Sequence, residues 1–158
     1  MNRVILNVFE MENEILDLLE REKHLVLATC LGERVTARTM SHVNIGMDIF
    51  FQTDKRFLKV EQMVTNPKVA LCVGNLQIEG IAELRGHPID EESIEFTSLY
   101  KKKHPHSFDT YANIKHEIVV KVMPSLITLW KYVAGKPCRD YLNISEKIAY
   151  REYYKLED

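Results

Sequence analysis

The stretch LQIEGIAEL, residues 76–84, alternates between two kinds of side chain. One face is small or apolar and carries Leu76, Ile78, Gly80, Ala82 and Leu84. The other face carries Gln77, Glu79, Ile81 and Glu83. A period of two residues is typical of a β-strand with one buried face and one face in water, as in antiparallel sheets. The stretch therefore indicates a protein built mainly from antiparallel strands.

Shorter strands with similar alternation precede this stretch. We expect them at residues 24–29, 34–43, 49–53 and 69–73. A turn at residues 31–33 separates the first two, and Gly46, which can adopt a positive φ, lies in the loop before the third. In the second strand, alternation should place Thr39 on one face and Arg38 and Met40 on the other.

Three segments have helical periodicity. Residues 11–22 place apolar groups on one face and acids on the other, which predicts an amphipathic helix over a barrel end. A second helix should run from Phe57 and end before Pro67, because the residue preceding a proline avoids the α region. A third is expected to have Asp90 as its N-cap and to be broken at residues 104–107.

The last third of the chain returns to strands. Residues 117–123 and 126–133 should form two strands across a bend at Pro124 and Ser125, followed by a last strand around residues 141–144. The length of 158 residues suits one domain, so we expect a single domain over residues 1–158. Its predicted class is mainly β (α+β), a barrel of about six to seven antiparallel strands with covering helices.

Composition limits the classes of partner and the compartment. A formal net charge of -2 gives no electrostatic reason to expect nucleic-acid binding. Three widely spaced cysteines, without a Cys-x-x-Cys pair, suit a reducing compartment. The apolar residues near the N-terminus are interrupted by Asn7 and followed by acids from Glu10 on, so they predict neither a signal peptide nor a membrane span. We therefore expect a cytoplasmic protein with no nucleic-acid or membrane partner.

The chain also carries cations at spacings that suit a phosphate group. They lie in Ala37-Arg38-Thr39-Met40 and Arg56-Phe57-Leu58-Lys59, with Phe51-Gln52-Thr53 between them. With this order of strands and short helix, roughly residues 1–90 resemble the pyridoxamine 5'-phosphate oxidase-like family of FMN-binding split β-barrels. The resemblance implies a homodimeric split barrel with FMN at the subunit interface.

The same resemblance assigns the phosphate contacts. Arg38 and Lys59 would hold the flavin phosphate through charge-assisted hydrogen bonds, each worth about 1.5–3 kcal/mol. Where the family has Ser-Arg before this lysine, the chain has Phe57-Leu58, and Arg56 would compensate in part. From the residues alone, the alternative is that Arg38 is a solvated strand cation and Lys59 a surface helix residue.

Further cofactor contacts are implied on the strands. Gln52 and Thr53 would touch the ring or ribityl chain. The full set of expected cofactor-binding residues is Arg38, Thr39, Met40, Gln52, Thr53, Arg56, Lys59, Asn75, Gln77 and Trp130. Asn75 and Gln77 match the region where the second subunit of the family reaches the flavin, although a turn asparagine also has a local explanation. Trp130 suits a wall near the ring or a dimer interface, with core packing as the alternative.

The resemblance implies an oxidoreductase that passes electrons from a reduced nicotinamide to a small acceptor. The flavin performs this chemistry, so no catalytic residue and no metal ligand are assigned. One alternative is a haem-binding protein that uses His42, His87 or His116. Others are a non-enzymatic split barrel and pyridoxamine phosphate oxidase-like activity, for which residues 138–142 do not reproduce the family's basic C-terminal motif.

Overall fold

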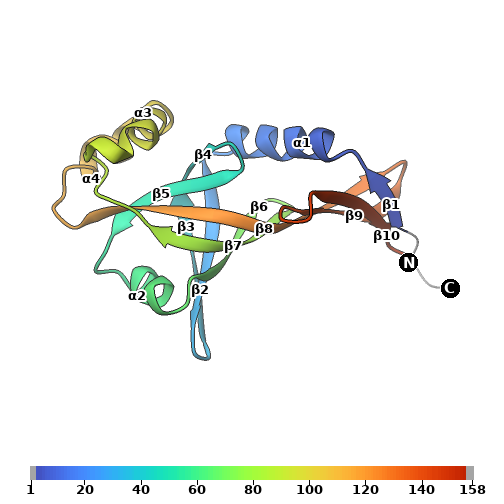
Figure 1. Ribbon diagram of the computed structural model, residues 1–158, viewed down its shortest axis with the longest axis horizontal. Helices are drawn as coiled ribbons and strands as arrows, with labels where there is room; N and C mark the ends of the chain where they lie inside the picture. Colours follow the sequence, from blue (N-terminus) through green and yellow to red (C-terminus); the bar gives the residue numbers. More distant parts are fainter. Residues whose placement is uncertain (1–2, 156–158) are drawn as a thin grey trace.

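A computed structural model describes residues 3–155, and these residues form ten strands and several short helices (Figure 1). The outermost residues of the expected domain, 1–2 and 156–158, lie outside the described part. The strands are β1 Arg3–Leu6, β2 His24–Leu31, β3 Arg34–Ser41, β4 Val43–Ile45, β5 Asp48–Asp54, β6 Lys68–Val73, β7 Leu76–Leu84, β8 Glu117–Val133, β9 Lys136–Asn143 and β10 Ile148–Tyr153. The helices are α1 Val8–Arg21, α2 Leu58–Thr65, the 3-10 turn η1 Glu91–Ser93, α3 Ile94–Lys103 and α4 Pro105–Tyr111.

The strands form one antiparallel sheet that curls at one end and extends at the other. The hydrogen-bonded order is β1-β10-β9-β8-β7-β6-β2-β3, and β5 pairs with both β4 and β8. The curled part therefore runs β3-β2-β6-β7-β8-β5 and is open between β3 and β5. Its extension consists of β9, β10 and β1. The predicted mainly-β barrel with covering helices is confirmed, but the expected six to seven strands were too few.

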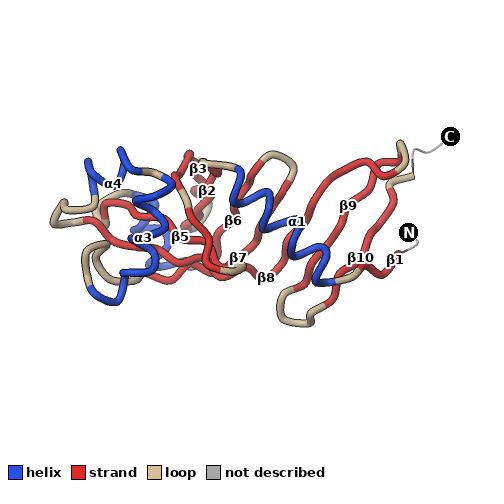
Figure 2. The backbone as a smooth tube through the Cα atoms, turned by 90° about the horizontal axis from the view of Figure 1, so that it is seen from above, coloured by secondary structure: helices blue, strands red, loops and turns tan. Residues whose placement is uncertain are grey.

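Alternation along the strands buries one apolar face, as the sequence predicted. Leu25 and Leu27 of β2 and Ile78 of β7 are buried in the main core. Helix α1 adds Ile15 and Leu19, which are fully buried, and lies across the sheet towards β9 and β10 (Figure 2). The predicted amphipathic helix is confirmed, and it positions the extension against the barrel.

Strand β8 is one continuous strand of 17 residues, so the predicted interruption at Pro124 and Ser125 was wrong. Its pairing with β7 shifts between Glu79 and Gly80, where Leu126 and Pro124 are successive partners and Ser125 is the extra residue. The Ser125 hydroxyl donates to the Glu79 carbonyl at 3.0 Å. A β-bulge tolerates a proline because the ladder needs no donor there.

Gly80 is required by this bulge. A Cβ at Gly80 would lie 2.7 Å from the Met123 carbonyl oxygen and 2.9 Å from a Val122 methyl. Because the nearest atom belongs to the backbone, we expect Gly80→Ala to lower the free energy of unfolding by about 1–3 kcal/mol. Urea denaturation measures this, with Gln77→Ala on the exposed face of the same strand as the control. Equal stability of the two variants would contradict the close approach.

Helix α4 was not predicted. The expected break after α3 exists, but Pro105 immediately begins another helix at its first position, where the missing N–H costs nothing. Asp90 precedes the turn η1, and its carboxylate accepts from the His87 N–H rather than from the helix. A second apolar cluster, which includes Phe96 and Tyr100, holds α3 against β4 and β8.

The extension is joined by a buried ion network. Asp140 of β9 is 1% exposed and receives two hydrogen bonds from Arg151 of β10, at 2.6 and 2.8 Å. Lys131 of β8 contacts the same carboxylate at 3.0 Å and also Glu14 of α1 at 2.8 Å. The network therefore links three strands and α1. Among residues 3–155, no helix is long and apolar enough to cross a membrane.

Candidate functional site

The opening between β3 and β5 contains a cleft of about 380 Å³, within the usual range for small-molecule sites. Within the described chain, β3 is the last strand in the pairing order, and the part of β5 beyond Phe50 pairs only with β8, so each strand presents an edge to the cleft. Such edges offer backbone donors and acceptors to a ligand. The lining residues are Thr39, Met40, Ser41, Gln52, Thr53, Asp54, Phe57, Lys59, Tyr100, Ser107, Tyr111 and Glu117.

Lys59 supplies the cation of the cleft. It lies in the first turn of α2, and its Nζ donates to Thr53 Oγ1 at 3.0 Å and lies 4.9 Å from the centre of the Phe57 ring. Burial, and then the positive charge of Arg38, lower the pKa of Lys59. An anion bound beside Lys59 would act in the opposite direction, because it stabilises the charged form of the amine.

Arg38 lies next to this cation, on the inward face of β3. Its guanidinium donates to Thr29 Oγ1 at 2.7 Å, to the Leu27 carbonyl at 3.3 Å and to Thr36 Oγ1. It is not a lining residue of the cleft, but its charge acts on Lys59. The two cations come from separate elements, α2 and β3, and only Lys59 lines the cleft, so a phosphate held by both stays a prediction.

Gln52 gives the cleft an unsatisfied polar group. Its side chain is 6% exposed, and neither amide atom has a hydrogen-bond partner among the described residues. Leaving a buried donor and acceptor unpaired costs about 1–3 kcal/mol each. A ligand that offers both an acceptor and a donor to Gln52 would recover this cost. Thr39, Met40 and Thr53, also predicted, line the same cleft.

The acidic side of the cleft was not predicted. Glu117, at the start of β8, is 7% exposed and lines the cleft beside hydroxyl groups of Tyr100, Ser107 and Tyr111. Burial raises the pKa of Glu117 to about 7, with the charge of Asp54 acting in the same direction. These residues come from segments far from β3 and β5 in sequence. The only local signal was a lone acid opening the apolar run EIVV.

Arg56 does not join the two cations. Its guanidinium donates to both oxygens of Asp54, at 2.9 and 2.6 Å, and its side chain is 62% exposed. The hydrogen bonds from Arg56 hold the pKa of Asp54 well below its usual range. The pair therefore neutralises the Asp54 carboxylate at the cleft, while Arg56 itself is not among the lining residues.

The three remaining predicted residues lie away from this cleft within one chain. Asn75 and Trp130 line a separate cleft of about 500 Å³ beside α1. Gln77 is exposed on the outer sheet face. Cross-strand partners share a face, and the register runs from Thr39 to Val26, then to Cys72, Gln77 and Thr128. The outer face that carries Gln77 therefore continues to Thr39 at the rim of the cleft.

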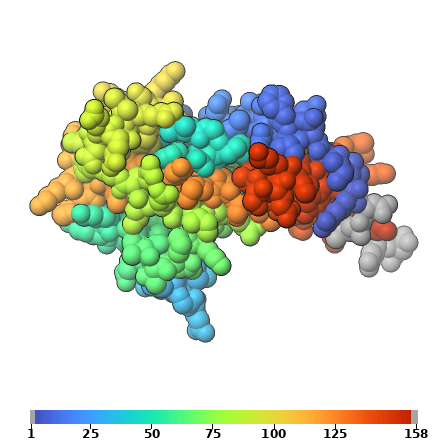
Figure 3. All heavy atoms as spheres, in the orientation of Figure 1, coloured from blue at the N-terminus to red at the C-terminus, as the bar shows by residue number. Residues whose placement is uncertain are grey.

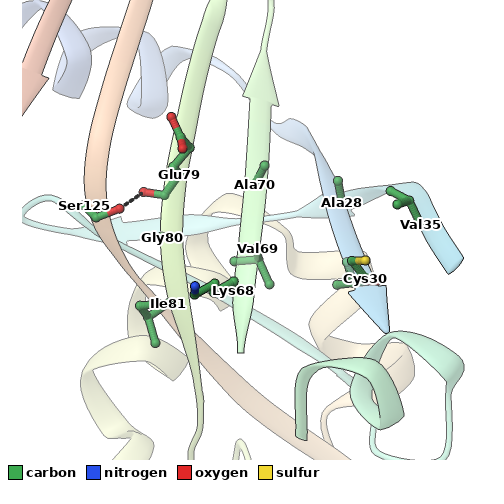
Figure 4. Close-up of a pocket in the computed structure, with 11 residues that line it drawn as sticks. Ala28, Cys30, Val35, Lys68, Val69, Ala70, Glu79, Gly80, Ile81 and Ser125 are labelled. Carbon is green, nitrogen blue, oxygen red and sulfur yellow. Dashed lines mark hydrogen bonds between the residues drawn. The ribbon is translucent and has the colours of Figure 1, made fainter. Parts of the chain in front are cut away.

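This outer face carries many small side chains (Figure 4). It carries a depression of about 470 Å³ lined by Ala28, Thr29, Cys30, Val35, Lys68, Val69, Ala70, Glu79, Gly80, Ile81 and Ser125. Val35 is 67% exposed and Ile81 is 39% exposed. Cys30 and Cys72 lie on this side of the sheet, where Cys30 is partly exposed and Cys72 is exposed. Its charged lining residues, Lys68 and Glu79, have opposite signs.

The three histidines considered for haem differ in accessibility. His42 is fully buried, neither ring nitrogen has a partner, and burial lowers its pKa to about 3. His87 contacts the Ile114 carbonyl through Nε2 at 2.8 Å, and His116 has a buried Nδ1 without a partner. Among the described residues, no three His, Cys, Asp or Glu side chains are placed to hold a metal ion.

Comparison with known proteins found relatives only among solved structures. No protein-family model matches the chain, and no curated protein matches it. A Listeria innocua protein provisionally named a pyridoxamine 5'-phosphate oxidase is 26% identical with a TM-score of 0.61, over 75% of this chain and 97% of that one. A pyridoxamine 5'-phosphate oxidase-related, FMN-binding protein of Nostoc punctiforme is 12% identical with a TM-score of 0.62, over 96% and 99%.

A third similar structure is HutZ, the haem storage protein of Vibrio cholerae. It is 15% identical with a TM-score of 0.61, over 72% of this chain and 89% of that one. The three share a fold with this chain, while their names record both a flavin and haem. The resemblance predicted from the order of strands and cations is confirmed.

Proposed function

We propose that this chain, whose fold is that of the pyridoxamine 5'-phosphate oxidase-like split barrels, binds FMN in the β3–β5 cleft and acts as a flavin-dependent oxidoreductase. The observation that carries the proposal is a cleft that combines the cation Lys59, on which the charge of Arg38 acts, with the unpaired amide of Gln52. Lys59 and Arg38 provide positive charge at one part of the site, and Gln52 provides an unsatisfied donor and acceptor.

These residues fit the parts of FMN. Lys59 and Arg38 would hold the phosphate, because charge-assisted hydrogen bonds suit a group of charge near -2. Gln52, with the free edges of β3 and β5, would hydrogen-bond the polar edge of the ring. When bound, the flavin supplies the redox chemistry, so the chain's own task is to bind, orient and shield it. Electron transfer from a reduced nicotinamide to a small acceptor needs no further catalytic acid or base.

A homodimer forms part of the proposal. The outer face of β2, β3, β6 and β7 exposes small and apolar side chains, a surface that a soluble protein usually covers. The β2–β3 hairpin, which carries the exposed Val35, projects from the body of the molecule (Figure 3). Because this face reaches Thr39 at the cleft rim, a second copy packed on it would bring Gln77 or Trp130 of one subunit towards the cleft of the other.

FMN titration of the purified protein tests the proposal. We expect saturable binding of one FMN per chain, with quenched flavin fluorescence, on a species that sediments as a dimer. Riboflavin, which lacks the phosphate, should bind more weakly, because it cannot pair with Arg38 and Lys59. A protein that neither contains nor takes up a flavin would refute the proposal.

The similarity to a haem storage protein keeps haem as the second candidate. Among the three histidines considered, His42 cannot reach an external ligand without rearrangement, because it has no exposed surface. Adding haemin in a parallel titration separates the candidates. A Soret band that shifts with stoichiometric haemin, in a protein that does not bind FMN, would favour a haem-binding role.

The free thiols of Cys30, Cys72 and Cys138 agree with the cytoplasmic location we propose.

A further inference from the structure

Glu117 is the group in the β3–β5 cleft for which neither the fold nor the flavin proposal has given a role. Glu117 is 7% exposed, and its carboxyl oxygens reach the cleft, since they are not among the fully buried side-chain atoms without a hydrogen-bond partner. Most of the residue is nevertheless removed from water, which disfavours a charged carboxylate. The same cleft contains the cation Lys59.

The surroundings of Glu117 favour its neutral form. Asp54 lies on the neighbouring strand, directly opposite Glu117 in the β5–β8 register. Two groups act in the opposite direction and lower the pKa of Glu117. They are His87, in the loop after β7, and Lys59, on α2. The remaining titratable groups that line the same cleft are the phenols of Tyr100 and Tyr111, and His116 acts on Asp54 through its charge. Burial dominates, so the pKa of Glu117 rises to about 7.

We propose that Glu117 is a ligand-binding residue of this cleft that acts as the protonated acid, donating a hydrogen bond to the phosphorylated ligand that Lys59 attracts. This inference rests on the proposed flavin site and goes beyond it, because it predicts that FMN binding is coupled to the uptake of a proton. An ionised Glu117 would repel the phosphate, whereas the protonated acid is a donor that can bond to it.

The direction of the pH effect follows from linkage. A bound dianion raises the pKa of Glu117 further above its value in the free protein, so the complex holds more protons than its components near neutral pH. FMN affinity should therefore fall as the pH rises above about 7. The second ionisation of a phosphate ester lies near pH 6, so the ligand is already almost fully dianionic in this range.

Calorimetric titration of the intact protein with FMN measures the proton directly. Titrations at pH 7.5 in two buffers of different ionisation enthalpy should show uptake of about 0.5–1 proton per FMN. Between pH 7 and 8.5 the dissociation constant should increase several-fold. Riboflavin should bind with little proton uptake, because it brings no phosphate to the cleft.

Glu117→Gln is the central variant, since glutamine keeps the shape of the side chain and can donate without a proton from solution. We expect it to bind FMN with no Glu117-linked proton uptake and with a flatter pH profile. Glu61→Gln is the matched control, because Glu61 is exposed on α2, the helix that bears Lys59. It should behave as the unaltered protein does. Deprotonation of Lys59 at high pH affects all three proteins alike.

The outcomes separate the two proposals. Equal proton uptake in the unaltered protein and in Glu117→Gln would overturn the role of Glu117 and leave the flavin site intact. No FMN binding by the unaltered protein would overturn the flavin site and this inference with it. If Glu117→Gln fails to fold, the comparison of FMN with riboflavin in the unaltered protein still tests the role of Glu117. Equal proton uptake with both ligands would refute the inference.

Discussion

Replacing Arg38 and Lys59 together by alanine is expected to weaken FMN binding by about 3–6 kcal/mol, or roughly 150- to 20,000-fold. The two side chains come from β3 and α2, and the charge of Arg38 already acts on Lys59. A phosphate between them would form a charge-assisted bond with each, worth about 1.5–3 kcal/mol. Fluorescence titration with FMN measures the loss, and riboflavin affinity should change far less.

Lys55→Ala is the matched control for this double variant. Lys55 is close in sequence to Lys59, but it is exposed and does not line the cleft. Its removal should leave FMN affinity within about twofold. Because Arg38 also donates to Thr29 and Thr36, thermal unfolding must show that the double variant is folded. Unchanged FMN affinity in a folded double variant would remove both cations from the site.

The second large effect is expected at Asp140, the centre of the ion network in the sheet extension. Asp140→Ala leaves Arg151, whose side chain is 15% exposed, without its two hydrogen bonds and removes one partner of Lys131. Breaking a buried ion pair by removing one member costs about 3–5 kcal/mol. We expect a loss of about 3 kcal/mol from the free energy of unfolding, because Lys131 keeps Glu14. Urea denaturation monitored by tryptophan fluorescence measures it.

Glu152→Ala provides the comparison for Asp140→Ala within the same extension. Glu152 pairs with Arg3, which is 61% exposed, so water compensates the loss of that contact. Its effect should be much smaller than that of Asp140→Ala. Similar stabilities of the two variants would show that the buried network adds nothing to the stability of the extension.

The barrel strands were predictable because their side chains alternate locally. The face assignments of Arg38, Thr39 and Met40 followed from period two alone, and β7 has the predicted bounds. Strands β1, β4 and β10 were missed, and the strand expected over residues 34–43 ends at Ser41, before β4 begins. Each missed strand is a short segment, only partly buried, that is defined by its antiparallel partner, and that partner lies far away in sequence for β1.

The continuity of β8 was not predicted because the strand contains a proline. Pro124 breaks the usual pattern of a central strand, and only its position opposite Gly80, at the bulge, makes it compatible with the ladder. The bulge is a property of two strands that lie more than 40 residues apart. The same reason explains why a local interpretation of residues 117–133 gave two strands instead of one.

For the site, sequence reasoning found the residues on the two strands and the helix that flank the opening. Gln52, Thr53 and Lys59 lie within one short segment, so their proximity was encoded locally. Glu117 and Tyr100 reach the cleft only because β8 pairs with β5 and α3 packs against β4. Contacts that depend on such long-range packing leave no periodic signal in the chain.

The pairing of β1 with β10 has a practical consequence for experiments on this protein. It brings both ends of the described chain to one end of the molecule, opposite α3 and α4 (Figure 1). An affinity tag, dye or tether fused at either end would therefore emerge far from the opening between β3 and β5. Immobilising the protein on a sensor chip through such a fusion should leave that opening free to exchange small molecules with the flowing solution.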